Sequence, residues 1–273
     1  MIGENIKTFA GLPVREYSAD QAVPSPEKYA IRISLGWEMH EEESLTFTNL
    51  FASLIDDPSC AQVQALVVGD WGGAGQGDGS APVVEALVSA RDALPALRAL
   101  FLGEMTSEES EISWINQSDV SPLFEAFPQL QELWIRGGND LALGNPRHEC
   151  LRKLVIQTGG LSASVLHDVA SASLPQLEHL ELWLGDDGYG NDIQIHDIEP
   201  LLTSCPFPKL GYLGFCDDCN ADETAKLIAR VGLPPTVQVL DLSLGTLSDE
   251  GAQALVESPC LKQLRKIDFH YHF

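Results

Sequence analysis

Apolar residues recur along most of the chain in one short pattern, L-x-x-L-x-L, in which V, I or F replaces some leucines. The complete copies begin at Val63, Leu97, Leu130, Leu151, Leu177, Leu210, Val237 and Leu264. Alternating apolar residues are typical of a strand, because successive side chains point to opposite faces of a sheet. A weaker copy spans 31–36, with Ile33 in the position of Leu66. The pattern predicts nine parallel strands centred on Ile33, Leu66, Leu100, Leu133, Leu154, Leu180, Leu213, Leu240 and Ile267.

Between these strands the apolar period becomes helical. The segments with this period are 80–88, 162–169, 197–202, 222–231 and 249–256. Ser248 is the predicted N-cap of the last of them, followed by acidic residues in the first turn. The centres of neighbouring strands lie 21 to 34 residues apart, and the shortest interval leaves room only for a loop at 136–146. A strand and a helix repeated at this interval predict an α/β solenoid, with parallel strands on a concave face and helices on a convex face.

The stretch 240–255 (LDLSLGTLSDEGAQAL) resembles the strand, turn and helix start of the ribonuclease-inhibitor-like subclass of leucine-rich-repeat proteins. The resemblance covers about 29–273, and the chain is also similar to bacterial leucine-rich-repeat proteins of unassigned function. It implies a horseshoe of about nine units behind an N-terminal cap at 1–28. One departure is clear: the family places Asn or Cys three residues after the last strand leucine, and this chain does not. That position holds Trp71, Met105, Gly138, Gly159, Gly185, Asp218, Gly245 and His272, so we expect irregular turns.

Charge narrows the range of partners. The 273 residues include 16 Lys and Arg against 40 Asp and Glu, a net charge of −24. Nucleic acids and anionic membranes attract cationic side chains, so neither is an expected partner. The chain has no apolar run of 18 residues and no signal-like start, and its six cysteines are too sparse for a disulfide scaffold. We therefore expect a cytoplasmic protein.

No catalytic arrangement can be assembled from the sequence. The glycine-rich segment 69–79 does not fit a phosphate-binding loop, since it offers neither G-x-G-x-x-G nor Gly-Lys-Ser/Thr. Cys216 and Cys219 have the spacing of half a zinc site, which leaves a metal or redox protein as one alternative. The acidic segment 186–192 lacks the spacing of an EF-hand, so a solvated loop is preferred to a calcium site. We expect no enzyme activity, no cofactor and no resident metal.

Two surfaces are candidates for binding a protein partner. The first consists of concave residues between the strand leucines: Trp134, Arg136, His179, Glu181, Trp183, Tyr212 and Asp241. The second is an acidic rim of loop residues after the strands: Asp70, Trp71, Glu104, Asp186, Asp187 and Tyr189. Acidic and aromatic side chains together favour a basic partner, through electrostatic steering and cation–π contacts. The competing interpretation is that the acid only maintains solubility.

The function predicted from these features is a non-enzymatic protein-binding scaffold. A regulator of an enzyme, of the inhibitor or GTPase-activator type, is an alternative that the resemblance implies. The sequence ends on a strand at 268–273, which predicts that Leu247, Leu255, Ile267 and Phe269 pack against a second copy or another chain. Alternatively, Tyr271 and Phe273 fold back as a minimal cap.

Overall fold

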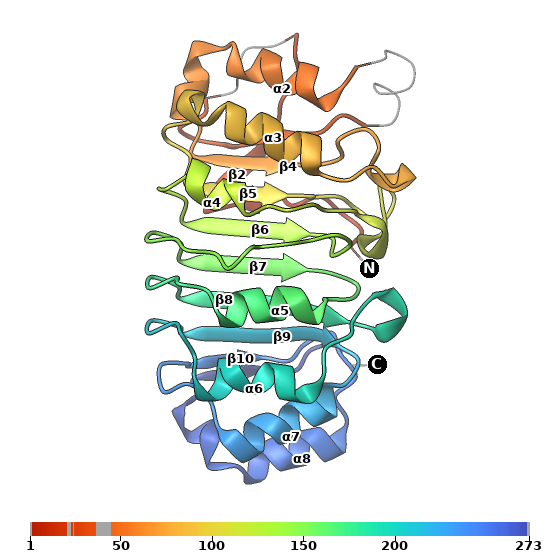
Figure 1. Cartoon of the computed structure of the whole chain (residues 1–273), viewed down its shortest axis with the longest axis vertical. Helices are drawn as coiled ribbons and strands as arrows, with labels where there is room; N and C mark the ends of the chain where they lie inside the picture. The colour runs from red at the N-terminus through yellow and green to blue at the C-terminus, as the bar shows by residue number, and fades with distance from the viewer. Residues whose placement is uncertain (1, 21–22, 24, 37–44, 272–273) are drawn as a thin grey trace. The chain divides into compact units, whose positions relative to one another are not determined.

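The computed structural model describes residues 2–20, 23, 25–36 and 45–271. These residues form two compact units, Met1–Ala142 and Leu143–Phe273. Each unit is a stack of strand–helix repeats, with the helices on one face of its sheet (Figure 1). None of the helices in the described part of the chain has the length and apolar character that a membrane span requires.

The sheet of the first unit follows the order of the sequence. Its strands are β1 (Thr8–Phe9), β2 (Leu12–Glu16), β3 (Ala30–Ile33), β4 (Ala65–Val68), β5 (Ala99–Leu102) and β6 (Glu132–Arg136). β1 and β2 form an antiparallel hairpin, and all later neighbours pair in parallel. The helices are α2 (Phe47–Ile55), α3 (Ala81–Ser89) and α4 (Pro122–Ala126).

The second unit has the same construction, and its neighbouring strands pair in parallel. Its strands are β7 (Lys153–Gln157), β8 (His179–Gly185), β9 (Tyr212–Asp218), β10 (Val239–Asp241) and β11 (Lys266–Asp268). Its helices are α5 (Ala163–Ala170), α6 (Ile195–Thr203), α7 (Ala221–Val231) and α8 (Asp249–Glu257). Short 3-10 turns connect several elements of both units.

The repeated leucines set the register of both sheets. Leu66, Leu100 and Leu133 lie side by side in the first unit, and all three are fully buried. In the second unit the adjacent residues are Leu154, Leu180, Leu213, Leu240 and Ile267. The prediction was wrong in one repeat, where Ile31 rather than Ile33 pairs with Leu66. Both isoleucines point to the core, so their own burial does not distinguish these registers.

The helices agree with the predicted segments at 80–88, 162–169, 197–202, 222–231 and 249–256. The hydroxyl of Ser248 accepts a hydrogen bond from the backbone N–H of Glu250 at 3.2 Å, as an N-cap does. Residues 137–146 contain no helix, as the short interval predicted. α2 and α4 were not predicted; α4 has five residues, too few to establish a helical period.

Glycine backbone packing replaces a side-chain ladder at some turns. Gly103 and Gly185 have φ of 85° and 71°, a region that glycine occupies without steric cost. A Cβ at Gly185 would lie 2.0 Å from the carbonyl oxygen of Gly159, so adjacent turns approach too closely for any side chain. This close approach gives a physical reason why positions 159 and 185 hold glycine instead of the Asn or Cys of the family pattern.

The end of the second unit is only partly covered. Leu255 is fully buried, whereas Leu247, Ile267 and Phe269 are half-buried. Tyr271 is 73% exposed, so the prediction that it folds back over the core is wrong. His272 and Phe273 lie outside the described residues, and contact with a second copy stays a prediction.

Candidate interaction surface

The sheet of the second unit has one face opposite its helices, which we call the helix-free face. Two rows of residues cross it. His179, Tyr212, Val239 and Lys266 are neighbours in the first row, and Glu181, Gly214, Asp241 and Asp268 are neighbours in the second. These residues alternate with the buried leucines, so their side chains point away from the helices. Lys153 and Val155 of β7 begin these rows beside His179 and Glu181; Val155 is apolar and fully buried, and most of the other residues are polar or aromatic.

Hydrogen bonds and stacking fix the aromatic side chains of this face. The rings of His179 and Tyr212 stack with centroids 3.7 Å apart. The Tyr212 hydroxyl donates to Asp241 at 2.5 Å, and the Trp183 indole N–H donates to Glu181 at 2.9 Å. His179, Glu181, Trp183 and Tyr212 remain half-buried, whereas Asp241 is 8% exposed. The face thus presents ordered aromatic side chains to solvent.

Gly214 gives these side chains the space they occupy. A Cβ at this position would lie 3.2 Å from Cε1 of Tyr212 and 3.3 Å from Cγ of Glu181. Burial, together with the charges of Glu181 and Asp241, raises the pKa of Tyr212 above its usual value. The phenol therefore stays protonated and continues to donate to Asp241 at neutral pH.

The geometry does not favour the metal or redox alternative for Cys216 and Cys219. Cys216 is 2% exposed, and burial raises the pKa of its thiol. Burial also raises the pKa of Cys219. A reactive cysteine needs the opposite shift, because the thiolate is the nucleophile and metal ligand. Among the described residues, no three His, Cys, Asp or Glu side chains are arranged to hold a metal ion.

In the first unit the corresponding face is apolar and covered. Ala65, Val67, Ala99 and Phe101 are buried there, and Phe9 of β1 packs over them. Trp134 lies at the edge of this cluster, with its ring 5.9 Å from that of Phe9 and 5.3 Å from that of Phe101. The prediction that this part of the concave face is open was therefore wrong.

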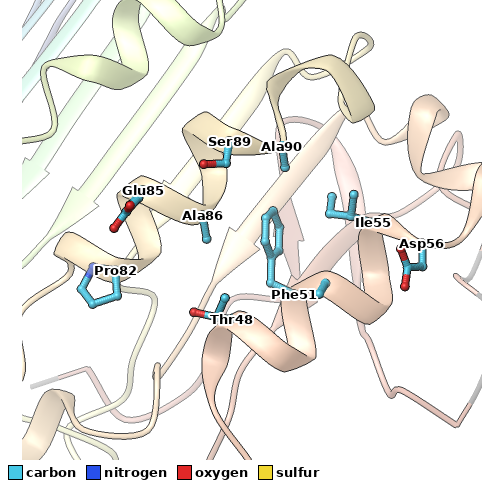
Figure 2. Close-up of a pocket in the computed structure, with 10 residues that line it drawn as sticks. Thr48, Phe51, Ile55, Asp56, Pro82, Glu85, Ala86, Ser89 and Ala90 are labelled. Carbon is cyan, nitrogen blue, oxygen red and sulfur yellow. The ribbon is translucent and has the colours of Figure 1, made fainter.

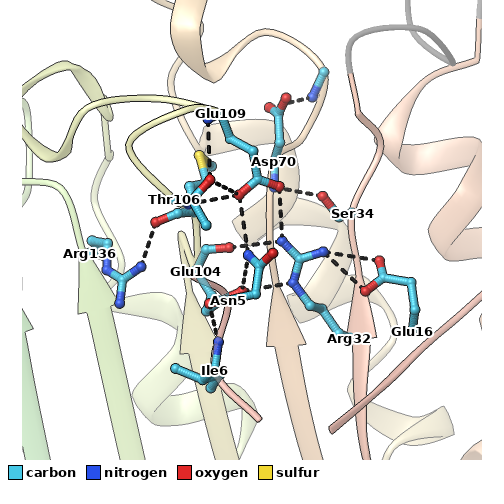
Figure 3. A network of polar contacts seen from close by, with 12 residues as sticks. Asn5, Ile6, Glu16, Arg32, Ser34, Asp70, Glu104, Thr106, Glu109 and Arg136 are labelled. Carbon is cyan, nitrogen blue, oxygen red and sulfur yellow. Dashed lines mark hydrogen bonds and ion pairs between the residues drawn. The ribbon is translucent and has the colours of Figure 1, made fainter. Parts of the chain in front are cut away.

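A network of charges centred on the buried side chains of Arg32 and Glu104 lies at the ends of these strands (Figure 3). The Arg32 guanidinium contacts Glu104 at 2.7 Å, Glu16 at 3.0 Å and Glu109 at 3.2 Å. Glu104 also accepts hydrogen bonds from the Ile6 backbone N–H and the Asn5 amide, at 2.9 and 3.1 Å. Glu104 is consequently inaccessible to solvent.

Arg136, a predicted partner-binding residue, belongs to the same buried region. It is 3% exposed, and its guanidinium donates to the backbone oxygen of Met105 at 2.5 Å. Burial lowers the pKa of Arg136 to about 10, although the charges of Glu104 and Glu109 oppose this shift. Arg136 is therefore not available on an open surface.

The predicted acidic rim divides between buried and exposed residues. Glu104 is fully buried, and Asp70 and Trp71 are 9% and 7% exposed, so the prediction of an exposed rim was wrong for all three. Their polar groups serve local turns: the Asp70 carboxylate accepts from the Gly72 N–H and the Trp71 indole donates to the Asp78 carbonyl. In the second unit, Asp186 and Asp187 are exposed, and Tyr189 is 57% exposed.

A comparison with one solved structure agrees with this architecture. A Bacteroides fragilis protein of known crystal structure is 30% identical to the chain, with a TM-score of 0.81. The match covers 90% of this chain and 70% of that protein. The chain belongs to the same family, and it is a leucine-rich-repeat protein. The leucine-rich repeat-containing protein LegL7 from Legionella pneumophila is 15% identical, with 93% and 89% of the two chains covered and a TM-score of 0.43. No family model and no curated protein matches the sequence.

This leucine-rich-repeat protein also has an open groove between α2 and α3 (Figure 2). Its volume is about 500 Å³, and the side chains of Phe51, Ile55 and Pro82 line it together with small residues of both helices. Asp56 and Glu85 are the acidic residues of its lining.

Proposed function

We propose that this leucine-rich-repeat protein is a non-enzymatic scaffold that binds a protein partner through the helix-free face of the second unit. The observation that carries the proposal is the half-buried set of His179, Trp183 and Tyr212, which stacking and hydrogen bonds hold in order. Tyr and Trp are enriched where interfaces gain most of their binding energy. Side chains ordered before binding lose less conformational entropy when a partner arrives.

The partner that fits this surface best is basic. Asp186, Asp187 and the exposed Tyr189 lie in the loop directly after β8, which carries His179, Glu181 and Trp183. Carboxylates attract a cationic partner over distances of about a Debye length, and an exposed aromatic ring contacts Lys or Arg through its π face. Affinity should therefore decrease as the salt concentration increases.

Site-specific photo-crosslinking tests the proposal. A photoreactive amino acid in place of Trp183 should capture the partner, and the same group in place of Val256 is the control. Val256 is 67% exposed on α8, away from the helix-free face. With the captured partner in hand, Trp183→Ala should weaken binding at least about tenfold, whereas Val256→Ala should not. Capture from position 256 alone, or equal affinity of the two variants, would refute the proposal.

A further inference from the structure

The apolar face of the first unit is covered by the protein's own N-terminus. We call residues 2–10 the N-terminal strap. Phe9 of the strap is 3% exposed and packs on the cluster formed by Ala65, Val67, Ala99 and Phe101. Without the strap these residues would form an exposed hydrophobic patch, which monomeric proteins keep small. The strap therefore occupies a face that needs an occupant.

The two carboxylates that bond to the strap keep other partners when the strap leaves. Glu104 accepts from Ile6 and Asn5 of the strap, and Glu109 accepts from Asn5 at 3.2 Å. Both carboxylates also contact Arg32, which is not part of the strap. In addition, the Thr106 backbone N–H donates to Glu109 at 2.7 Å. Departure of the strap thus leaves the charges compensated. The strap's backbone oxygens at Ile2 and Lys7 also accept from the N–H groups of Ser107 and Val14, at 2.8 and 2.9 Å, and an incoming segment would have to replace these bonds.

The strap is joined to β2 by an exposed turn. Ala10 and Gly11 have φ of 48° and 77°, and no atom lies within 4 Å of a Cβ built on Gly11. β2 pairs with β3 through Val14, Arg15 and Glu16, none of which belongs to the strap. Departure of the strap would break its own pairing with β2, at Phe9 and Leu12, while the pairing with β3 would hold β2 at the edge of the sheet.

We propose that the strap is an intramolecular ligand and that the face beneath it binds an extended segment of a partner protein. The strap itself shows the chemistry of that segment: a large aromatic side chain in the place of Phe9, and an amide side chain followed by a backbone N–H in the places of Asn5 and Ile6. This site lies in the first unit and is independent of the surface in the second unit proposed above.

Cutting the turn tests this proposal on the full chain. A protease recognition sequence is inserted between Ala10 and Gly11, the folded protein is cut, and a fluorescent peptide of residues 2–10 is added. Anisotropy should show saturable one-to-one exchange of the peptide into the cut protein. The uncut protein should bind at least tenfold less, because its tethered strap competes.

Two peptide variants make the measurement specific. Phe9→Ala in the peptide should weaken binding at least tenfold, because Phe9 is the buried anchor. Lys7→Ala is the matched control and should bind as the wild-type peptide does. The Lys7 side chain is 84% exposed, and its ion pair is with Glu4 of the same peptide.

No exchange into a cut protein that keeps its circular dichroism and melting temperature would overturn the proposal, since the strap would then be a permanent part of the core. The proposal would also be overturned if cut and uncut protein bound the peptide equally, or if the Phe9→Ala peptide bound as tightly as the wild-type peptide. If cutting unfolds the first unit, uncut protein carrying Phe9→Ala is used instead. This variant should admit the wild-type peptide, and failure to do so refutes the proposal. Trp183→Ala should leave every one of these results unchanged.

Discussion

Replacement of Arg32 by Met tests how much the buried charge network stabilises the first unit. The Arg32 side chain is 8% exposed, and its partner Glu104 is completely buried. Met preserves much of the aliphatic volume but removes the charge, so the Glu104 carboxylate loses its ion pair. Breaking a buried ion pair from one side costs about 3–5 kcal/mol. We expect the lower end, about 3 kcal/mol, because Asn5 and Ile6 still donate to Glu104.

Glu16→Gln is the matched control, because it removes a contact of the same guanidinium at an accessible position. The Glu16 side chain is 52% exposed, and exposed ion pairs contribute less than about 1 kcal/mol. A double variant, Arg32→Met with Glu104→Gln, removes both charges and should recover part of the loss.

Urea denaturation followed by tryptophan fluorescence measures these differences. Trp37, Trp71, Trp114 and Trp134 precede residue 143, so the signal reports mainly on the first unit. The reasoning would be refuted if Arg32→Met lost no more stability than Glu16→Gln. It would also be refuted if the double variant were less stable than both Arg32→Met and Glu104→Gln. Either result would mean that Glu104 is solvated or compensated in a way that the network does not show.

Three further predictions concern the second unit. Gly185→Ala should lower the free energy of unfolding, measured by chemical denaturation, at least about 2 kcal/mol more than Gly232→Ala does. Both glycines have positive φ, but only at Gly185 would a Cβ meet neighbouring backbone atoms. Equal losses of stability in the two variants would contradict this. Burial raises the pKa of Asp217 to about 6, above its value in the unfolded chain, so ionisation should destabilise the native state progressively from pH 4 to 7. Asp217→Asn should remove that decline and raise the free energy of unfolding by on the order of 1 kcal/mol at pH 7. If the stability of this variant fell with pH as steeply as that of the wild type, the prediction would be wrong. Leu180→Asp places a carboxylate in the core and should cost about 4 kcal/mol or more by thermal melting, whereas unchanged melting would refute the register.

Strand register was predictable from the sequence because it depends on a local property. The central residue is a fully buried leucine in seven repeats, from Leu66 to Leu240, and within each unit the leucines of neighbouring repeats lie side by side. The exception shows the limit of this reasoning. Ile31, Ile33 and Leu35 are all buried, and a shift by two residues keeps each side chain on the same face. Only the pairing of β3 with β4 distinguishes the alternatives.

Exposure of the inter-leucine residues was not predictable in the same way, because it depends on distant parts of the chain. Ile6 and Glu104 are separated by 98 positions, and Arg32 and Glu104 by 72. No spacing rule connects such residues. One signal was nevertheless present: 65–68 and 99–102 are apolar at every position, which is typical of a strand covered on both faces. The predicted residues of the second unit lack this signal, and their side chains lie on a partly exposed face.

The identity of the inter-leucine residues therefore determines what each face can do. In the second unit Glu181, Asp241 and Asp268 are in one row, and two of these carboxylates accept hydrogen bonds from Trp183 and Tyr212 of the same face. In the first unit the equivalent row includes Val67 and Phe101, whose exposure would carry a free-energy cost of about 25 cal/mol for each Å² of apolar surface. That face must be covered in any stable state, whether by residues 2–10 or by a partner. The proposed exchange would thus make the face of the first unit accessible only when residues 2–10 leave it, whereas the face of the second unit is partly exposed without such a step.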